Sequence, residues 1–372
     1  MKFIHLSDLH IGKRVNEFSM LDDQRYILAQ ILETIKLEKP DAVLIAGDIY
    51  DIPQPSVEAM NLLDSFLDEL FSLGIHTMII SGNHDSAERI SFGSKRMVNH
   101  MHICPAYDGK THKVMLTDKN GEVDFYMLPF VKPVTVRSMF PDEDILDYTS
   151  AVRSAISHMN VDTSRRNVLI AHQFVTGATR CDSEEISLGG QDNIDASVFS
   201  PFDYVALGHI HGPQKVERET IRYCGTPLKY SFSERNHIKS VTVVQFDSKD
   251  NIQIEAKKLK PLRDMREIRG SYAEVISSTK SEDYIRVILS DETPIPDALS
   301  ELRKIFPNIM RLEYDNSRTR LTDSGTQGIQ NPKQLNPLEI FSTFYKERTQ
   351  TEMDKKQTDF IKTLIQEIWE ES

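Results

Sequence analysis

Five short polar motifs recur along this chain of 372 residues, and each directly follows an apolar run typical of a buried strand. In chain order, the motifs are Asp8–His10, Gly47–Asp51, Gly82–Asp85, Ala171–His172 and Gly208–His211. Ligands recur at the carboxyl ends of sheet strands in α/β proteins, so we expect these motifs to meet at one edge of one core. This expectation restricts the fold more than any other feature of the sequence.

The apolar runs and the segments between them predict the fold class. The expected strands are Lys2–Ser7, Ala42–Ala46, Thr77–Ser81, Val168–Ala171 and Tyr204–Leu207. Helical spacing predicts a helix over Gln24–Leu37 and another that Ser56 caps and Gly74 stops. From about Val114 the chain becomes rich in strands. We therefore predict an α/β protein over residues 1–265, in which helices flank a β-sandwich in the order α/β/β/α.

Two further units follow residue 265. Residues 266–316 predict a small α+β capping domain, with strands at Ala273–Ile276, Tyr284–Leu289 and Ile309–Tyr314 and a helix opening at Pro296. Residues 317–335 lose periodicity and have the composition of a linker. Residues 336–372 predict two amphipathic helices, which fit docking onto a partner as well as packing on the chain's own body.

The charge of the chain limits how it can meet nucleic acid. The formal net charge is −12, whereas affinity for a polyanion comes largely from Lys and Arg. Tight unaided DNA binding is therefore not expected. One local basic group, Arg89, Lys95 and Arg96, is the candidate DNA contact, although it fits a solvated face equally well.

Cysteine usage and the apolar segments indicate a compartment. Cys104, Cys181 and Cys224 are odd in number and widely spaced, which argues against a disulfide scaffold or a structural zinc site. Neither a signal peptide nor a segment long and apolar enough to span a membrane is evident. We expect a cytoplasmic protein.

The side chains of the motifs predict a metal centre. Asp, Asn and His suit a pair of divalent metals that clamp a phosphate ester and activate a water. A ligand that touches both metals must be a carboxylate, and Asp48 is the natural bridge. The remaining candidates divide between a first metal (Asp8, His10 and His211) and a second metal (Asn83, His172 and His209).

Two further features of the motifs carry predictions. A glycine precedes Asp48, Asn83 and His209, as expected where the backbone bends sharply to aim a ligand inward. His84 is the candidate general acid or phosphate-orienting group, and Asp85 is expected to fix its tautomer and raise its basicity. Histidines outside the motifs are expected to be ordinary surface or core residues.

The ordered set of motifs resembles the calcineurin-like metallophosphoesterases, and within them the nucleases that repair DNA double-strand breaks. The resemblance is strongest over residues 1–265. It implies two Mn²⁺ ions per site, with Mg²⁺ also compatible with such ligands, and His84 as the acid. One position differs, because the archaeal and eukaryotic enzymes carry a second histidine where this chain has Asp51.

The resemblance also implies substrates and partners. These are DNA ends, hairpins and single strands, cut by 3′–5′ exonuclease and endonuclease activities in replication, recombination and repair. A homodimer would form through helices at residues 57–73 and 86–98. A large SMC-like ATPase would bind the C-terminal helices and provide DNA-binding charge.

Two alternative functions stay open on the sequence. One is a small-substrate phosphatase or phosphodiesterase of the same superfamily. The motifs of serine/threonine phosphatases read Gly-Asp-x-x-Asp-Arg-Gly and Gly-Asn-His-Glu, whereas here Ile52 follows Asp51 and Asp85 follows His84, which disfavours that branch. The other is a non-catalytic scaffold, whose signature would be missing ligands, and no ligand is missing from the motifs.

Overall fold

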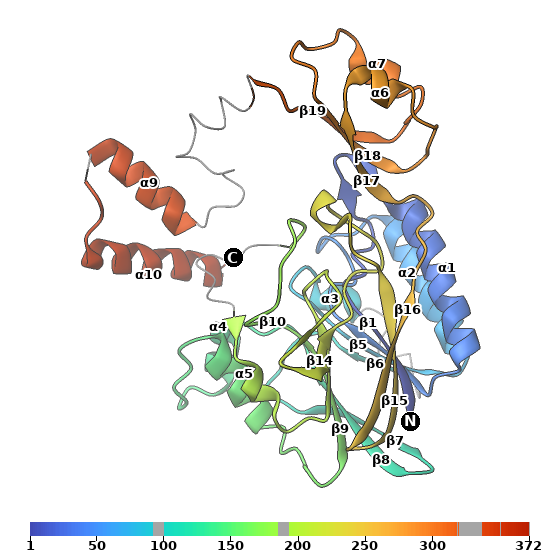
Figure 1. The fold of residues 1–372 in the computed structure, drawn as a ribbon. Helices are drawn as coiled ribbons and strands as arrows, with labels where there is room; N and C mark the ends of the chain where they lie inside the picture. The colour runs from blue at the N-terminus through green and yellow to red at the C-terminus, as the bar shows by residue number, and fades with distance from the viewer. Residues whose placement is uncertain (92–99, 185–192, 318, 320–336, 350, 372) are drawn as a thin grey trace.

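Two six-stranded sheets face each other in the computed structural model, and helices cover their outer faces (Figure 1). The structure describes residues 1–91, 100–184, 193–317, 319, 337–349 and 351–371. This arrangement confirms the predicted α/β/β/α sandwich.

The first sheet carries three of the five motifs. Its strand order is β16-β15-β1-β4-β5-β6, and β1, β4, β5 and β6 run parallel. Helices α1 (Leu21–Glu38) and α2 (Val57–Ser72) cover its outer face, and the Ser56 hydroxyl caps α2 by accepting from the Ala59 N–H at 3.2 Å. The strands are β1 (Lys2–Leu6), β4 (Ala42–Ala46), β5 (His76–Ile80), β6 (Met101–Cys104), β15 (Ser240–Ser248) and β16 (Asn251–Lys258).

The second sheet carries the other two motifs. Its strand order is β13-β14-β12-β9-β8-β7, with β8, β9, β12 and β14 parallel. Helices α4 (Pro133–Met139) and α5 (Tyr148–Ser157) and the 3₁₀ turn η3 (Ala196–Phe199) pack on its outer face. The strands are β7 (His112–Asp118), β8 (Gly121–Leu128), β9 (Arg166–His172), β12 (Tyr204–Gly208), β13 (Gln214–Val216) and β14 (Arg218–Tyr223).

Aromatic and aliphatic side chains fill the space between the two sheets. Phe3 of the first sheet makes edge contacts with Phe125 and Tyr204 of the second, at centroid distances of 5.7 and 5.3 Å. All three side chains are buried, as expected for strands that are covered on both faces. This shared core fixes the two sheets against each other, so the ends of β1, β4, β5, β9 and β12 hold their side chains in fixed relative positions.

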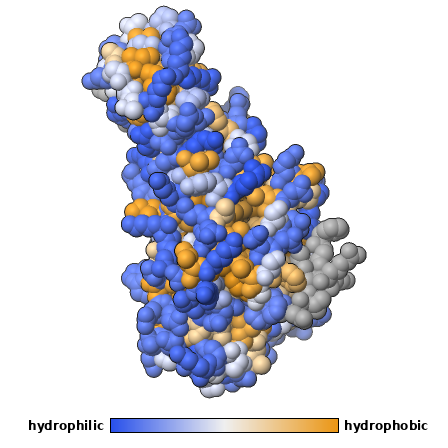
Figure 2. Space-filling view, turned by 90° about the vertical axis from the view of Figure 1, so that its right-hand side faces the viewer, coloured by the Kyte–Doolittle hydropathy of each residue, from blue (hydrophilic) through white to orange (hydrophobic). Residues whose placement is uncertain are grey.

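A separate lobe follows the sandwich, at the top of the space-filling view (Figure 2). It contains a parallel three-stranded sheet, β17 (Met265–Gly270), β18 (Tyr284–Leu289) and β19 (Ile309–Tyr314), covered by α6 (Tyr272–Ile276) and α7 (Ala298–Leu302).

One strand predicted for this lobe is wrong, and another was missed. Residues 273–276 lie in helix α6, because Ser271 and Glu274 form a capping box that starts a helix there. The missed strand is β17, whose charged residues interrupt the alternation expected of a strand.

Buried polar contacts join the lobe to the sandwich. The Asp23 carboxylate of α1 is buried and accepts hydrogen bonds from Arg263 and from the hydroxyl of Tyr284, both at 2.7 Å. The next residue of α1, Gln24, donates to the carbonyl of His10 at 2.7 Å. Helix α1 thus contacts both the lobe and the first motif.

The two predicted C-terminal helices are confirmed as α9 (Pro337–Thr349) and α10 (Lys355–Glu371), which Figure 1 draws side by side and apart from the sheets. Their exposed aromatic side chains include Phe344 and Phe360, at 52% and 64% exposure.

Several predictions fall partly or wholly outside the described residues. They concern the linker at 317–335, apart from Ser317 and Thr319, and the second predicted dimer helix at 86–98, of which the structure describes α3 (Ala87–Ile90) and Ser91. Among the described helices, none has the length and apolar character needed to cross a bilayer.

Short elements complete the description. They are β2 (Arg14–Val15), β3 (Phe18–Ser19), β10 (Phe174–Val175), β11 (Asn193–Ile194) and η4 (Phe232–Glu234).

Candidate metal centre

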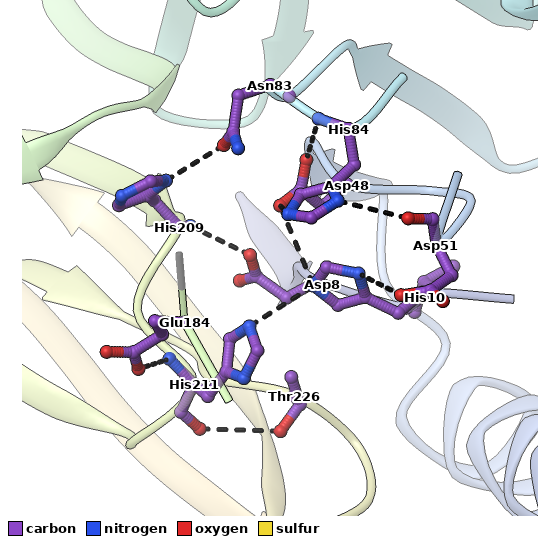
Figure 3. A network of polar contacts seen from close by, with 12 residues as sticks. Asp8, His10, Asp48, Asp51, Asn83, His84, Glu184, His209, His211 and Thr226 are labelled. Carbon is purple, nitrogen blue, oxygen red and sulfur yellow. Dashed lines mark hydrogen bonds and ion pairs between the residues drawn. The ribbon is translucent and has the colours of Figure 1, made fainter. Parts of the chain in front are cut away.

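The five motifs converge at one edge of the sandwich, around the carboxylate of Asp48. Figure 3 shows four of them, those that contain Asp8, Asp48, Asn83 and His209. Asp48 follows β4, and its Oδ2 lies 3.3 Å from His172 Nε2, 3.6 Å from His10 Nε2 and 4.0 Å from His84 Nε2. His172 is the last residue of β9, and His10 and His84 lie in the loops that follow β1 and β5. The carboxylate proposed as the bridge is therefore central to the cluster.

The backbone at the strand ends adopts unusual conformations. Asp8, His10, Asp48 and His209 have φ values of 52°, 44°, 50° and 104°, in the left-handed region that residues other than glycine rarely occupy. Such strain persists where surrounding contacts enforce it, and it clusters at functional sites. Hydrogen bonds from Asp8 N to Gly47 O and from His10 N to Asp48 O, both 3.0 Å, fix two of these loops together.

The glycines of the motifs serve close packing more than bending. Gly47 has a positive φ of 82°, as predicted, but Gly82 and Gly208 do not. A side chain on Gly82 would lie 2.0 Å from Asp48 Oδ1, and one on Gly208 would lie 1.8 Å from the Ala46 carbonyl oxygen. The sharp bend predicted at these two positions therefore does not depend on a left-handed glycine, and the structure adds a requirement for space beside the Asp48 carboxylate and the Ala46 carbonyl.

The first group of candidate ligands is Asp8, His10 and His211. The Nε2 atoms of His10 and His211 lie 3.2 Å apart, and both rings are buried. Asp8 Oδ2 is buried and has no hydrogen-bond partner among the residues that the structure describes. Two imidazole nitrogens and an unpaired carboxylate oxygen directed at one point fit a divalent cation.

The second group is Asn83, His172 and His209. Asn83 Oδ1 lies 2.9 Å from His209 Nδ1 and 3.1 Å from His172 Nε2. His209 is buried, and Nδ1 is the ring nitrogen that it presents to this point. Together with Asp48, these nitrogen and oxygen atoms fit a second cation, so the residues present suit the metal pair that the motifs predict.

Burial and neighbouring charge set opposite protonation states for the site histidines. Burial alone would lower the pKa of His172, but the Asp48 carboxylate raises it to about 9. Burial lowers the pKa of His209 to about 3 and that of His211 well below its ordinary value. Burial also opposes ionisation of Asp48, yet His172 and His10 hold its pKa well below the usual range.

The contacts of Asp85 contradict the role predicted for it. Its carboxylate accepts hydrogen bonds from the backbone N–H groups of Ile49, Tyr50 and Gly82 at 2.9–3.1 Å. The His84 ring instead contacts the Asp51 carbonyl oxygen through Nδ1, at 3.0 Å. The prediction that Asp85 fixes the tautomer of His84 is wrong: Asp85 joins the loops after β4 and β5, and a backbone carbonyl orients His84.

The Asp51 side chain supports the first group. Asp51 Oδ1 lies 3.5 Å from His10 Nδ1, on the opposite side of the ring from Nε2, and 2.7 Å from Lys13 Nζ. A carboxylate behind a histidine holds its orientation and leaves the other nitrogen available to a metal. Asp51, left without a role by the motif pattern, therefore places a negative charge behind the His10 ring without a hydrogen bond to it.

The candidate general acid is the most accessible of the central histidines. The His84 side chain is 15% exposed, against 1% for His10 and 0% for His172. Its ring meets that of His10 edge-on at 4.9 Å. His84 therefore borders the cluster on its open side, where a substrate would enter.

The candidate DNA contacts are only partly described. Arg89 is exposed in the last turn of α3, whereas Lys95 and Arg96 lie outside the described residues. Another basic pair in the sequence, Arg165 and Arg166, is paired internally. These two arginines bind Asp124 and Asp118 and so stabilise the sandwich.

Comparison with known proteins gives the class of protein first. Residues 1–213 match the calcineurin-like phosphoesterase family, and residues 261–349 match the type 5 capsule protein repressor C-terminal domain. A dimetal phosphatase from Danio rerio aligns over 69% of this chain and 96% of its own, with 11% identity and a TM-score of 0.43.

Two curated relatives narrow this class. Both are the SbcD subunit of the nuclease SbcCD. The protein of Staphylococcus epidermidis is 33% identical over 98% of both chains, and that of Staphylococcus saprophyticus is 32% identical over 100% of this chain and 99% of its own. The chain belongs to the calcineurin-like phosphoesterases and, within them, to the SbcD family of nuclease subunits. It is therefore a metal-dependent phosphodiester hydrolase.

Proposed function

We propose that this chain is a DNA nuclease that hydrolyses phosphodiester bonds with two metal ions. The observation that carries the proposal is the convergence of Asp8, His10, Asn83, His172, His209 and His211 around the Asp48 carboxylate. The nuclease relatives, similar over their full length, support DNA as the substrate.

The residues divide the chemistry between them. Asp8, His10 and His211 would hold one metal, Asn83, His172 and His209 the other, and Asp48 both. When bound, such a pair polarises the phosphate and supplies a hydroxide nucleophile at neutral pH. His84, oriented by the Asp51 carbonyl, points its Nε2 toward this cluster and donates a proton or hydrogen bond to the departing oxygen.

The metal, the DNA structures and the partners form the finer part of the proposal. Manganese is the proposed physiological ion, and DNA ends, hairpins and single strands are the proposed substrates. The proposed partner is an SbcC-type ATPase that binds the exposed apolar faces of α9 and α10, including Phe344 and Phe360. Helix α2, whose Val57 and Phe71 are 62% and 50% exposed, supports a homodimer interface at residues 57–73.

Substrate choice tests the proposed activity. Purified protein with Mn²⁺ is expected to degrade linear duplex DNA and to open hairpins, with no cleavage in EDTA. The comparison substrate is a small phosphodiester, bis-p-nitrophenyl phosphate, at matched phosphodiester concentration. A higher kcat/KM for the small ester would favour the small-substrate alternative and contradict the nuclease proposal.

Removal of the C-terminal helices tests the partner. A chain ending at residue 335 is expected to keep its Mn²⁺-dependent cleavage of DNA but to lose co-purification with the ATPase. Circular dichroism of the shortened chain provides the control. If the shortened chain unfolds, α9 and α10 belong to its own core and the docking proposal is contradicted.

A further inference from the structure

A buried ion pair lies behind the first group of candidate ligands, outside all five motifs. Glu234, in η4, and Lys239 are 0% and 4% exposed, and the carboxylate binds the ammonium directly. Burial would raise the pKa of Glu234, but Lys239 holds it below the ordinary value. Because burying two charges is costly, such a pair is weak evidence for stability alone, and its other contacts are informative.

The contacts of Glu234 lead to the ring of His211. Ser183 Oγ lies 2.6 Å from Glu234 Oε1 and 2.7 Å from His211 Nδ1. A carboxylate can only accept, so the single hydroxyl hydrogen of Ser183 is donated to Glu234. The Ser183 oxygen must then accept from His211, which places a hydrogen on Nδ1 and leaves the Nε2 lone pair directed at His10.

Lys239 and Glu184 also bind the backbone of His211. Lys239 Nζ donates to the His211 carbonyl at 2.9 Å and to the Thr226 hydroxyl at 2.7 Å, so all three of its hydrogens are used. Glu184, the neighbour of Ser183, accepts from the His211 N–H at 2.7 Å. These contacts fix the position of the His211 backbone, and the Ser183 hydroxyl fixes the tautomer and the rotation of the His211 ring.

We propose that Ser183 is a positioning residue for metal binding, which couples the buried Lys239–Glu234 pair to the imidazole of His211. The inference rests on the proposed role of His211 as a metal ligand. Neutral His211 alone has two tautomers, and only the one with a free Nε2 can bind a metal beside His10. We call this chain of contacts, from Lys239 through Glu234 and Ser183 to His211, the relay. It selects that tautomer before the metal arrives.

Substitution of Ser183 tests the relay through metal binding rather than activity. For Ser183→Ala, calorimetric titration with Mn²⁺ is expected to show about 10–100-fold weaker binding at one position, the range seen when such supporting partners are removed. The other position keeps its affinity. Electron paramagnetic resonance at limiting Mn²⁺ is expected to change from a coupled pair to a mononuclear signal.

Two variants control this measurement. Ser231 also donates to Glu234 Oε1, at 3.1 Å, without contacting His211, so Ser231→Ala is expected to bind Mn²⁺ as the wild type does. Ser183→Thr keeps the hydroxyl and is expected to restore affinity to within about threefold, well inside the loss expected for Ser183→Ala. If Ser183→Ala fails to fold, judged by its thermal midpoint without metal, Ser183→Thr decides: restored affinity supports the relay and lost affinity overturns it.

The outcomes separate this inference from the proposed function. If Ser183→Ala binds two Mn²⁺ ions with wild-type affinity, or if Ser231→Ala loses as much affinity, the relay is overturned while the nuclease proposal stands. If the wild-type chain itself binds no Mn²⁺, both proposals fail. Weakened binding in Ser183→Ala, with Ser231→Ala unchanged, supports the relay.

Discussion

The two groups of candidate ligands share Asp48 but are supported in different ways. In the first group, charged side chains act behind the histidines: Asp51 behind His10, and Glu234, through Ser183, behind His211. In the second group, His172 Nδ1 donates to the backbone carbonyl of Ala46 at 2.8 Å. One metal position thus depends on side chains that single substitutions can remove, and the other depends on the strand β4 itself.

The two groups also differ in protonation. His172 has a pKa raised to about 9 beside Asp48, whereas burial lowers the pKa values of His10 and His211. A metal must therefore displace a proton from His172 in the second group, whereas in the first group it meets neutral imidazoles and the Asp8 carboxyl, whose pKa burial raises to about 7. This contrast predicts that the two positions can be separated experimentally, by substitution and by pH.

The largest effect is expected from substitution of Asp48, the carboxylate that the two groups share. Asp48→Asn leaves no bridging carboxylate, so Mn²⁺ stoichiometry is expected to fall from two toward zero. DNA cleavage should fall by at least about 10³-fold, the upper scale for losing one principal electrostatic contribution. Calorimetry and a nuclease assay measure the two quantities. Retention of one tightly bound Mn²⁺ would show that Asp48 serves one group only.

Substitution of His84 should affect chemistry without affecting either group. His84→Ala is expected to keep both metals and to lower kcat by about 10²–10⁴-fold, the usual contribution of a positioned acid. The matched control is His158→Ala, which removes a half-exposed histidine paired with Glu143 away from the site. Loss of a metal in His84→Ala would place His84 among the ligands and contradict its role as an acid.

Substitution of Asp51 should affect the first group alone. Asp51→Asn keeps the carbonyl that orients His84 but removes the charge behind His10, so we expect about 10–100-fold weaker Mn²⁺ binding at one position. A control is Asp283→Asn, whose carboxylate pairs with Arg266 in the lobe. Equal weakening at both positions would mean that the two groups do not have separate supports.

The sequence predicts the candidate metal ligands better than the residues that support those ligands from behind. Asp48 and the candidate histidines each stand directly after an apolar run, and that local pattern is sufficient to find them. Ser183 and Lys239 lie in loops and Glu234 lies in the short 3₁₀ turn η4, so no periodic pattern marks them, and only the folded chain brings them together behind His211. Nothing in their spacing indicates the relay, because it depends on contacts between residues 28 to 51 positions apart.

The same distinction explains the errors in the prediction. Asp85 follows His84 in sequence, yet its carboxylate joins the loops after β4 and β5, since two backbone N–H groups in the first loop and one in the second need an acceptor. Residues 273–276 have the composition of a strand, but the cap formed by Ser271 overrides it. Local pattern predicts element type and ligand identity well, whereas side-chain partners require the tertiary structure.

The smallest expected effect is the pH dependence of Mn²⁺ affinity, which should differ between the two groups. Because the pKa of His172 is raised to about 9, the second position must release a proton at any pH below that value. Its Mn²⁺ affinity is expected to rise about 16-fold in total between pH 7.5 and 9, since one proton competes with one metal and the competition weakens as the pH approaches this pKa. The first position should change little over this range, because burial lowers the pKa values of His10 and His211 and they are already neutral. Calorimetry in buffers of different ionisation enthalpy measures the protons released. Equal release at both positions would contradict the contrast between the groups.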